Sequence, residues 1–239
     1  MKVVVSVGGS VLAPDLEADR VSQYAAALEG LDDEGHELGV VVGGGPTARE
    51  YIETARELGA NEIELDEIGI AVTRLNGRFL IAALDERAAP TPSETYEDGR
   101  EALRRGDIPV LGGTVAAQTT DAVSAAFAEY VNADLLVYAT SVPGVFSADP
   151  NVDATAEKYE EMSADDLVDL IADLEMNAGS NAPVDLLAAK IIQRAGLRAI
   201  VLDGTDPEAV AQAIRTGEHD GTDVLPNGHG TDPEQWDRE

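Results

Sequence analysis

The chain has 239 residues and carries 46 Asp and Glu against 16 Lys and Arg, which gives a formal net charge of −30. This balance argues against nucleic acid as a partner, because nothing in the sequence offers a basic stripe to phosphodiester backbones. The absence of cysteine excludes disulfides and thiolate metal sites. No apolar segment approaches the roughly 20 residues of a membrane span, and no secretory signal is evident, so we expect a cytoplasmic protein without membrane association.

Apolar runs typical of buried strands recur along the chain, and helical stretches of ten or more residues separate most of them. The runs are VVVSV (3–7), LGVVV (38–42), IPVL (108–111), DLLVYA (134–139) and RAIVLD (198–203). Strands that alternate with helices predict an α/β fold with a mainly parallel sheet covered on both faces. We find no internal repeat or linker and expect one domain over residues 1–225, followed by a solvated tail, 226–239.

Local chemistry marks several boundaries. Pro46 falls in the first turn of a predicted helix and Gly59 just past its end, the usual placement of these two residue types. Asp66 precedes EIGIAVTRLNGRFLIAAL, which has an apolar face and predicts one long helix, so we expect Asp66 to be its N-cap. Residues 143–160 contain turn formers and no helical period, which predicts a hairpin or an extended flap.

Turns rich in glycine or hydroxyl residues follow four of the predicted strands. They are Gly8-Gly9-Ser10, Gly43-Gly44-Gly45, Gly112-Gly113-Thr114 and Thr140-Ser141. One such turn is weak evidence, because a tight connection from strand to helix needs glycine anyway. Ligands of open parallel sheets bind beyond the carboxyl ends of the strands, so four such turns at one edge predict a binding site there.

The second turn is the most informative. In VVVGGGPTAREY, three glycines stand directly before a helix N-terminus, where free amides and the helix dipole favour an anion. Arg49 lies one turn into that helix and can reach back over the site; a surface ion pair is the alternative role. The segment is neither a dinucleotide fingerprint nor a Walker loop, because it lacks G-x-G-x-x-G and Gly-Lys-Ser/Thr.

The third turn leads into GGTVAAQTTDAVSAAFAEY, residues 112–130. Its hydroxyls and its amide can hydrogen-bond a polar ligand, and Asp121 falls in the first turn of the helix that follows. Ordinary capping of that helix is the alternative role for its polar residues. The ligand-binding candidates are Thr114, Gln118, Thr119 and Thr120.

Six motifs occur in order over residues 1–200: VGGS, VVVGGGPTAREY, DEIGI, GGTVAAQTTDAVSAA, VPGVFSADP and LLAAKIIQRAG. Together they resemble the amino-acid kinase superfamily and, within it, the archaeal type of uridylate (UMP) kinase. The resemblance implies a three-layer α/β/α sandwich with a mainly parallel sheet. It also implies an N-terminal half that binds the phosphoryl acceptor, a C-terminal half that binds ATP, and a homohexamer.

The resemblance further implies transfer of the γ-phosphoryl group of MgATP to UMP, giving UDP, with Mg²⁺ arriving on the nucleotide rather than on a protein metal site. It assigns the ATP phosphates to Gly9, Ser10, Gly45 and Arg49. It assigns the nucleoside of ATP to Thr140, Phe146 and Asp149. It assigns UMP to Gly44, Asp66, Thr114, Val115, Ala116, Ala117, Gln118, Thr119 and Thr120.

Phosphate chemistry needs positive charge, and the chain has only three lysines. Lys2 begins the first strand, and five extended residues separate it from Gly8, so it lies toward the wrong edge of the sheet. Lys158 sits in the acidic stretch EKYEE, where we expect it to be paired. These two placements leave Lys190 as the remaining lysine.

Lys190 falls in PVDLLAAKIIQRAG, a predicted helix with Leu186, Leu187 and Ile191 on its buried side. A lysine of the matching family motif reaches the transferring phosphoryl group. We therefore expect Lys190 and Arg49 to act in catalysis, with Asp121 orienting Lys190. The alternative is a surface side chain that snorkels to solvent.

Two other functions remain open. Isopentenyl phosphate kinase shares this fold, but such relatives usually place a histidine in the helix after the Gly-Gly-Gly turn, and PTAREYIETAREL has none. A nucleotide-binding sensor of this fold would bind ATP or UTP without turnover. Formation of UDP from UMP separates both from a UMP kinase.

The acidic residues are spread along the whole chain, so the charge belongs to the surface rather than to a tail. Such a surface repels itself at low ionic strength. In molar salt the Debye length falls to roughly 3 Å and the repulsion largely disappears. This indicates a protein from a salt-in cytoplasm; a merely acidic mesophilic protein is the alternative.

We predict that folding and hexamer assembly are weak in dilute buffer and firm in molar KCl, because salt screens the −30 charge. Thermal melts across a KCl series, with the mass followed by light scattering, measure both effects. A melting temperature independent of salt would contradict the screening argument and favour a specific role for the acidic residues.

Overall fold

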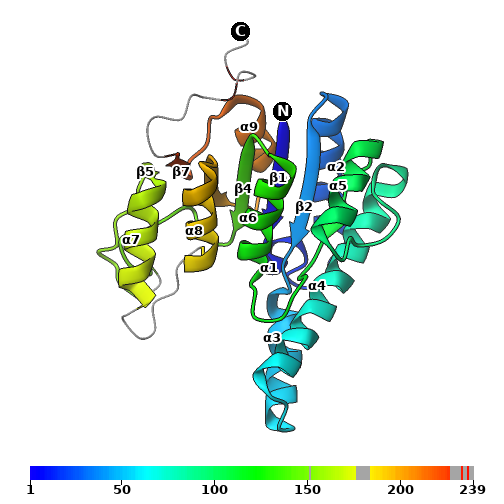
Figure 1. Ribbon diagram of the computed structural model, residues 1–239, viewed down its shortest axis with the longest axis horizontal. Coiled ribbons are helices and arrows are strands. Elements are labelled where there is room, and N and C mark those ends of the chain that lie inside the picture. Colours follow the sequence, from blue (N-terminus) through cyan, green and yellow to red (C-terminus); the bar gives the residue numbers. More distant parts are fainter. Residues whose placement is uncertain (151, 176–183, 227–232, 234–235, 237–239) are drawn as a thin grey trace.

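The computed structural model describes residues 1–150, 152–175, 184–226, 233 and 236. Its strands form one sheet in the order β3-β2-β1-β4-β6-β7-β5 (Figure 1). All neighbouring strands run parallel except β6 and β7. The strands are β1 Lys2–Val7, β2 Glu37–Val42, β3 Val110–Leu111, β4 Leu135–Thr140, β5 Glu161–Ser163, β6 Ala199–Asp203 and β7 Thr222–Leu225.

Helices cover both faces of the sheet, as Figure 1 shows. They are α1 Gly9–Leu12, α2 Ala18–Asp33, α3 Gly45–Glu57, α4 Glu62–Leu84, α5 Tyr96–Arg105, α6 Thr120–Val131, α7 Ala164–Glu175, α8 Leu186–Ala195 and α9 Pro207–Thr216, with a short 3₁₀ helix at Asp85–Arg87. Apolar side chains of α2, α4 and α9 pack on one face, and those of α5, α6, α7 and α8 pack on the other. The predicted three-layer α/β/α sandwich with a mainly parallel sheet is confirmed.

The central strands are buried on both faces, which explains their continuous apolar runs. Side chains alternate across a strand, so β1 sends Val3, Val5 and Val7 to the core under α2 and α9 and Val4 to the core under α6 and α8. All five predicted strands are present. The predicted strand at 108–111 is the shortest in the structure, because only Val110 and Leu111 pair with β2.

Strands β5 and β7 were not predicted. β7 is half-buried with the sequence TDVL, and β5 has only three residues. Neither carries the unbroken apolar run of a central strand, because each lies near an edge of the sheet. Antiparallel pairing of β7 with β6 is the one exception to the parallel pattern among the described strands.

The prediction that Asp66 caps the long helix is wrong. Helix α4 begins one turn earlier, at Glu62, and its N-cap is Asn61, whose side chain accepts from the amides of Ile63 and Glu64. The Glu64 carboxylate accepts in turn from the Asn61 amide at 2.8 Å, which completes a capping box. Asp66 thus lies inside α4, where its carboxylate is available to a neighbouring loop.

The predicted flap at 143–160 is an extended loop held as a narrow hairpin. The amide of Ser147 donates to the Glu157 carbonyl at 2.9 Å, and the amide of Tyr159 donates to the Val145 carbonyl at 2.9 Å. An isolated antiparallel bridge joins Phe146 to Lys158. Apart from Asn151, which lies outside the described residues, this loop is tied to β7, because the Val145 amide donates to the Thr222 hydroxyl at 2.9 Å.

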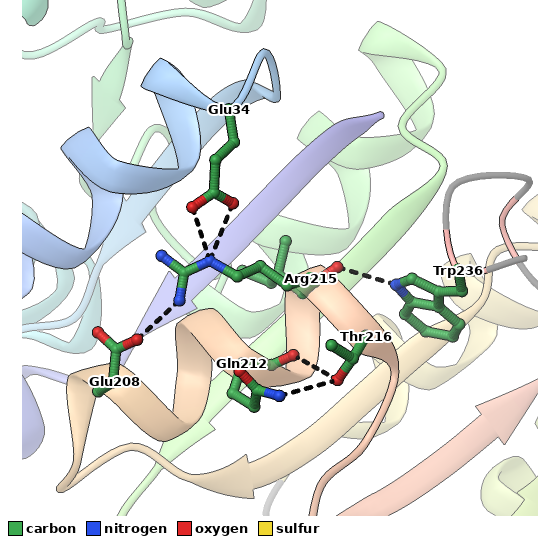
Figure 2. A network of polar contacts seen from close by, with 7 residues as sticks. Glu34, Glu208, Gln212, Arg215, Thr216 and Trp236 are labelled. Atoms are coloured by element: carbon green, nitrogen blue, oxygen red, sulfur yellow. Dashed lines mark hydrogen bonds and ion pairs between the residues drawn. The ribbon is translucent and has the colours of Figure 1, made fainter. Parts of the chain in front are cut away.

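Most of the predicted solvated tail, 226–239, lies outside the described residues. Trp236, however, packs against the body of the protein: its Nε1 donates to the Ile214 carbonyl at 2.8 Å, at the end of α9 (Figure 2). The Arg198 guanidinium lies 4.7 Å from the Trp236 ring centroid. In the same region Arg215 joins α9 to α2 through Glu34.

No helix of the described chain is both long enough and apolar enough to cross a bilayer. The longest, α4, has 23 residues, but its sequence carries charged side chains along its length.

Candidate functional site

The first two glycine turns touch each other through their backbones. Strands β1 and β2 pair in register up to Val7 and Val42, so the turns that follow meet at the same edge of the sheet. A Cβ on Gly9 would collide with the backbone of Gly43, Gly44 and Gly45. Glycine is therefore required here for the approach of two chain segments, whatever ligand they bind.

The Gly43–Gly45 turn also has the backbone shape of an anion site. Gly44 is right-handed helical, with φ −81° and ψ −30°, and Gly45 is left-handed, with φ +65°. Successive residues of these two kinds point their N–H groups into one concavity, a nest. The structure shows no described acceptor for the amides of Gly44 and Gly45, so both donors are available to a ligand.

A cleft of about 640 Å³ opens beside these turns. It brings together the predicted catalytic Asp121 and most of the residues predicted to bind ATP. Those that line it are Ser10, Arg49, Thr140, Phe146 and Asp149. Gly9 and Gly45 do not line the cleft; they form the backbone contact next to Ser10.

The flap supplies one wall of this cleft. Phe146, Ala148 and Asp149 line it, and Asp149 is 9% exposed. On the facing strand end, Thr140 shapes the turn, since its hydroxyl donates to the Val142 carbonyl at 2.9 Å and accepts from the Val142 amide at 3.0 Å. The wall therefore combines an aromatic ring with polar groups, as a nucleoside requires.

The residues predicted to bind the acceptor lie at the same edge of the sheet, around the loop that follows β3. Oδ2 of Asp66 accepts from the Ala117 amide at 2.8 Å, which joins α4 to the 114–120 loop across 51 residues of sequence. Ala117 has φ +66°, a strained value for a residue other than glycine. The Thr114 hydroxyl is buried and has no partner among the described residues.

Within that loop the alternative of helix capping holds for Thr119. Its hydroxyl oxygen accepts from the Ala122 amide at 3.1 Å, so Thr119 is the N-cap of α6. The same hydroxyl donates to Asp185, the N-cap of α8.

The other residues of this loop lie around Thr119. Gln118 accepts from the Tyr96 hydroxyl at 3.4 Å. The remaining loop residues predicted to contact UMP are Val115, which is exposed, Ala116, and Thr120, the first residue of α6.

Two buried polar residues of α4 were missed from the sequence. Asn76 donates to the carbonyls of Gly43 and Gly44, and the Thr73 hydroxyl accepts from the Gly113 amide at 2.7 Å. They lie three residues apart in a helix whose sequence otherwise suggests only an apolar face. The sequence did hold a signal for them. Thr73 and Asn76 are polar residues on the apolar face of α4, and buried polar side chains need hydrogen-bond partners.

The structure does not place Lys190 in the cleft. Lys190 is exposed on α8, whose buried residues are Ala188, Ala189, Ile191 and Ile192. The prediction that Leu187 lies on the buried side is wrong, because Leu187 is 45% exposed. The polypeptide just before this helix, 176–183, lies outside the described residues.

The other two lysines lie away from the cleft. Lys2 forms an ion pair with Glu37 at 3.6 Å and donates to the Val131 carbonyl at 3.2 Å, at the amino end of β1. Lys158 donates to the backbone carbonyl of Asp220 rather than to its own acidic stretch. Arg49 is thus the one basic side chain among the described residues that line the cleft.

Asp121 has a different neighbour from the one expected. The pKa of its carboxyl is raised from 3.8 to about 7. Burial is the main cause, and the nearby Asp185 carboxylate is the second. The Tyr138 hydroxyl donates to the Asp121 backbone carbonyl at 3.0 Å. The described residues show no contact between Asp121 and Lys190, so the predicted orienting role stays a prediction.

Known proteins were compared with this sequence and fold. The sequence profile of the amino acid kinase family matches residues 1–203. The chain belongs to the amino acid kinase family. It is 74% identical to the uridylate kinase of Haloarcula marismortui over 226 residues, covering 95% of this chain and 99% of that protein. It is 68% identical to the uridylate kinase of Halobacterium salinarum over 236 residues, covering 99% and 98%.

The fold agrees with this family. The crystal structure of uridylate kinase from Archaeoglobus fulgidus superposes with a TM-score of 0.85 at 42% sequence identity, covering 94% of this chain and all of that one. The order of the six motifs therefore identified the family.

The raised pKa of Asp121 leads to a test. An acid with a higher pKa in the folded protein than in the unfolded chain stabilises the fold at low pH, and this contribution is lost as the pH rises from about 4 to about 7. The neutral, isosteric Asp121→Asn avoids this loss. We expect its unfolding free energy, relative to the parent, to gain up to about 1.4 kcal/mol per pH unit across that window and then level off.

Chemical denaturation in molar KCl at several pH values measures this difference. Asp153→Asn is the control, because hydrogen bonds from Thr155 lower the pKa of Asp153 and the sign of the effect is opposite. Parallel stability curves for Asp121→Asn and its parent would show that folding does not raise the pKa of Asp121.

Proposed function

We propose that this protein is a UMP kinase that transfers the γ-phosphoryl group of ATP to UMP, giving ADP and UDP in pyrimidine nucleotide biosynthesis. The main support for the proposal is that two separate candidate binding sites lie at one edge of the sheet. A cleft lined by Arg49 and Phe146 lies on one side of the glycine turns, and the loop tied to Asp66 lies on the other. Similarity to uridylate kinases along almost the whole chain supports the same activity.

The two substrates divide the chain into halves. The N-terminal half would bind UMP through Gly44, Asp66 and the 114–120 loop, where the unpaired Thr114 hydroxyl offers a hydrogen bond to a polar ligand. The C-terminal half would bind the nucleoside of ATP through Thr140 and the flap. Both nucleotides would place their phosphates at the glycine turns between them. A cytoplasmic location follows from these substrates.

The reaction makes modest demands on the protein. The phosphate of UMP is already an anion at neutral pH, so no general base is needed to activate it. Catalysis then rests on in-line positioning of the two phosphates and on neutralising their charge. Arg49, which lines the cleft, and the amides of Gly44 and Gly45 would supply part of this charge.

Mg²⁺ is expected to enter with ATP. It is usually held by one or two carboxylates together with substrate phosphates, and it neutralises charge on the transferring group. The Asp121 carboxyl and the Ser10 hydroxyl line the cleft and offer oxygen atoms of the kind that Mg²⁺ prefers. Among the described residues, no group of three or more acidic or histidine side chains is arranged to hold a metal ion.

We also propose that the protein assembles as a homohexamer. Helices α3 and α4 extend beyond the sheet in Figure 1 and carry large exposed apolar side chains. Leu58 is 85% exposed and Ile63 is 52% exposed, next to a shallow apolar groove between these helices. Such patches mark contacts between proteins. Light scattering in molar KCl measures the mass, and a chain that stays monomeric there would contradict the proposal.

The choice of acceptor tests the proposed activity against its alternatives. We expect UMP to be phosphorylated much faster than AMP, GMP or isopentenyl phosphate, because a site built to hydrogen-bond its substrate leaves buried polar groups unpaired with the wrong one. A coupled assay of ADP formation in molar KCl compares the four acceptors. Faster turnover of isopentenyl phosphate would favour the related kinase, and nucleotide binding without turnover would favour a sensor.

Lys190 is proposed as a second source of charge beside Arg49. Side chains of a helix lean toward its N-terminus, and the N-terminus of α8 contacts Thr119 at the edge of the site through Asp185. We expect Lys190→Met to lower kcat by about a hundredfold or more, as loss of a charge stabiliser does, with little change in UMP binding.

Arg194→Met is the matched control, because Arg194 is an exposed cation of the same helix that pairs with Glu129. If Lys190→Met retains the parent kcat, the charge comes from elsewhere. Arg49→Met then becomes the decisive variant, since Arg49 already lines the cleft.

A further inference from the structure

Asn76 is one of the two buried polar residues of α4 that the reaction described above does not use. Its side chain is almost fully enclosed, at 2% exposure. Its Nδ2 donates to the Gly43 carbonyl at 2.9 Å and to the Gly44 carbonyl at 3.2 Å. One amide group therefore holds two successive carbonyls of the turn that precedes α3.

The geometry of the peptide bond gives these contacts a consequence. In a trans peptide, the carbonyl and the N–H of the next residue point in opposite directions. When the carbonyls of Gly43 and Gly44 point at Asn76, the N–H groups of Gly44 and Gly45 point away from α4. These two amides form the nest, and Pro46 adds no third donor because it has no N–H.

Glycine peptides need such restraint. Without a Cβ, Gly43, Gly44 and Gly45 can each populate other backbone regions, so the turn does not fix its own amide directions. The contact with Gly9 limits where the turn lies, and Asn76 fixes which way its peptides face. A preorganised pair of donors binds an anion better than a mobile pair, because no ordering is left to be done on binding.

We infer that Asn76 is a positioning residue for the acceptor phosphate: it holds the Gly43 and Gly44 carbonyls so that the amide of Gly44 faces the phosphate of UMP and the amide of Gly45 faces the adjoining position, where the resemblance places the ATP phosphates. The inference rests on the proposed UMP kinase activity. It adds a residue of α4 that never touches the nucleotide yet sets the affinity for one part of it.

The test compares UMP with uridine, which has the same base and ribose but no phosphate. Calorimetry in molar KCl gives the dissociation constants of both for the parent and for Asn76→Leu, a variant of similar size without the donor. We expect the affinity for UMP to fall at least about tenfold and the affinity for uridine to stay unchanged.

Leu80→Ala is the control for stability alone. Leu80 lies on α4 one turn after Asn76, is fully buried and contacts neither glycine turn through a hydrogen bond. Equal losses for UMP and uridine, or a loss that Leu80→Ala reproduces at equal stability, would overturn the inference, as would unchanged UMP binding by Asn76→Leu. If Asn76→Leu does not fold, Asn76→Ala, which also removes the donor, carries the same comparison. Absence of UDP formation by the parent would defeat the proposed activity, while the binding ratios would still decide the role of Asn76.

Discussion

The site depends on the contact between two backbone turns. Parallel pairing of β1 with β2 brings the residues after Val7 and Val42 to the same level, and the turns then pack with no side chain between them. Only glycine at position 9 permits this, because a Cβ would meet the backbone of Gly43–Gly45. The approach places two loops, and the helices that follow them, around one small volume. The phosphate chemistry proposed for the protein needs such a volume, lined by N–H groups rather than by side chains.

Patterns with a single physical cause were predictable from the sequence. Central strands buried on both faces show as apolar runs, and the family motifs fixed the order of the turns along one edge. Where two local signals competed, sequence reasoning failed: both Asn61 and Asp66 are good N-caps, and the choice fell to Asn61 because Glu64 completes a capping box. Strands β5 and β7 had no comparable signal, because short, partly buried strands near the edge of a sheet do not need a continuous apolar run.

The site was predicted less completely than the fold, for a reason that Asn76 and Asp121 illustrate. The Asn76 side chain holds the carbonyls of Gly43 and Gly44, far away in the sequence, and the pKa of Asp121 is raised first by burial and then by the distant Asp185 carboxylate. Composition and spacing show that a residue can donate or titrate, but not what faces it. The cleft residues of the flap were found only because the motif VPGVFSADP resembles that of a known family.

The charge of the chain bears on why amides should dominate this site. ATP and UMP are anions, and a protein with a net charge of −30 repels them at a distance in dilute buffer. In molar salt the Debye length is roughly 3 Å, so both the repulsion and any steering by distant cations vanish. What survives is contact: an N–H group at hydrogen-bonding distance acts within that length, and Arg49 acts at the same range. The two preorganised amides and Arg49 therefore keep most of their affinity for an anion in salt. Such a site also needs no basic surface patch, which would bind other anions.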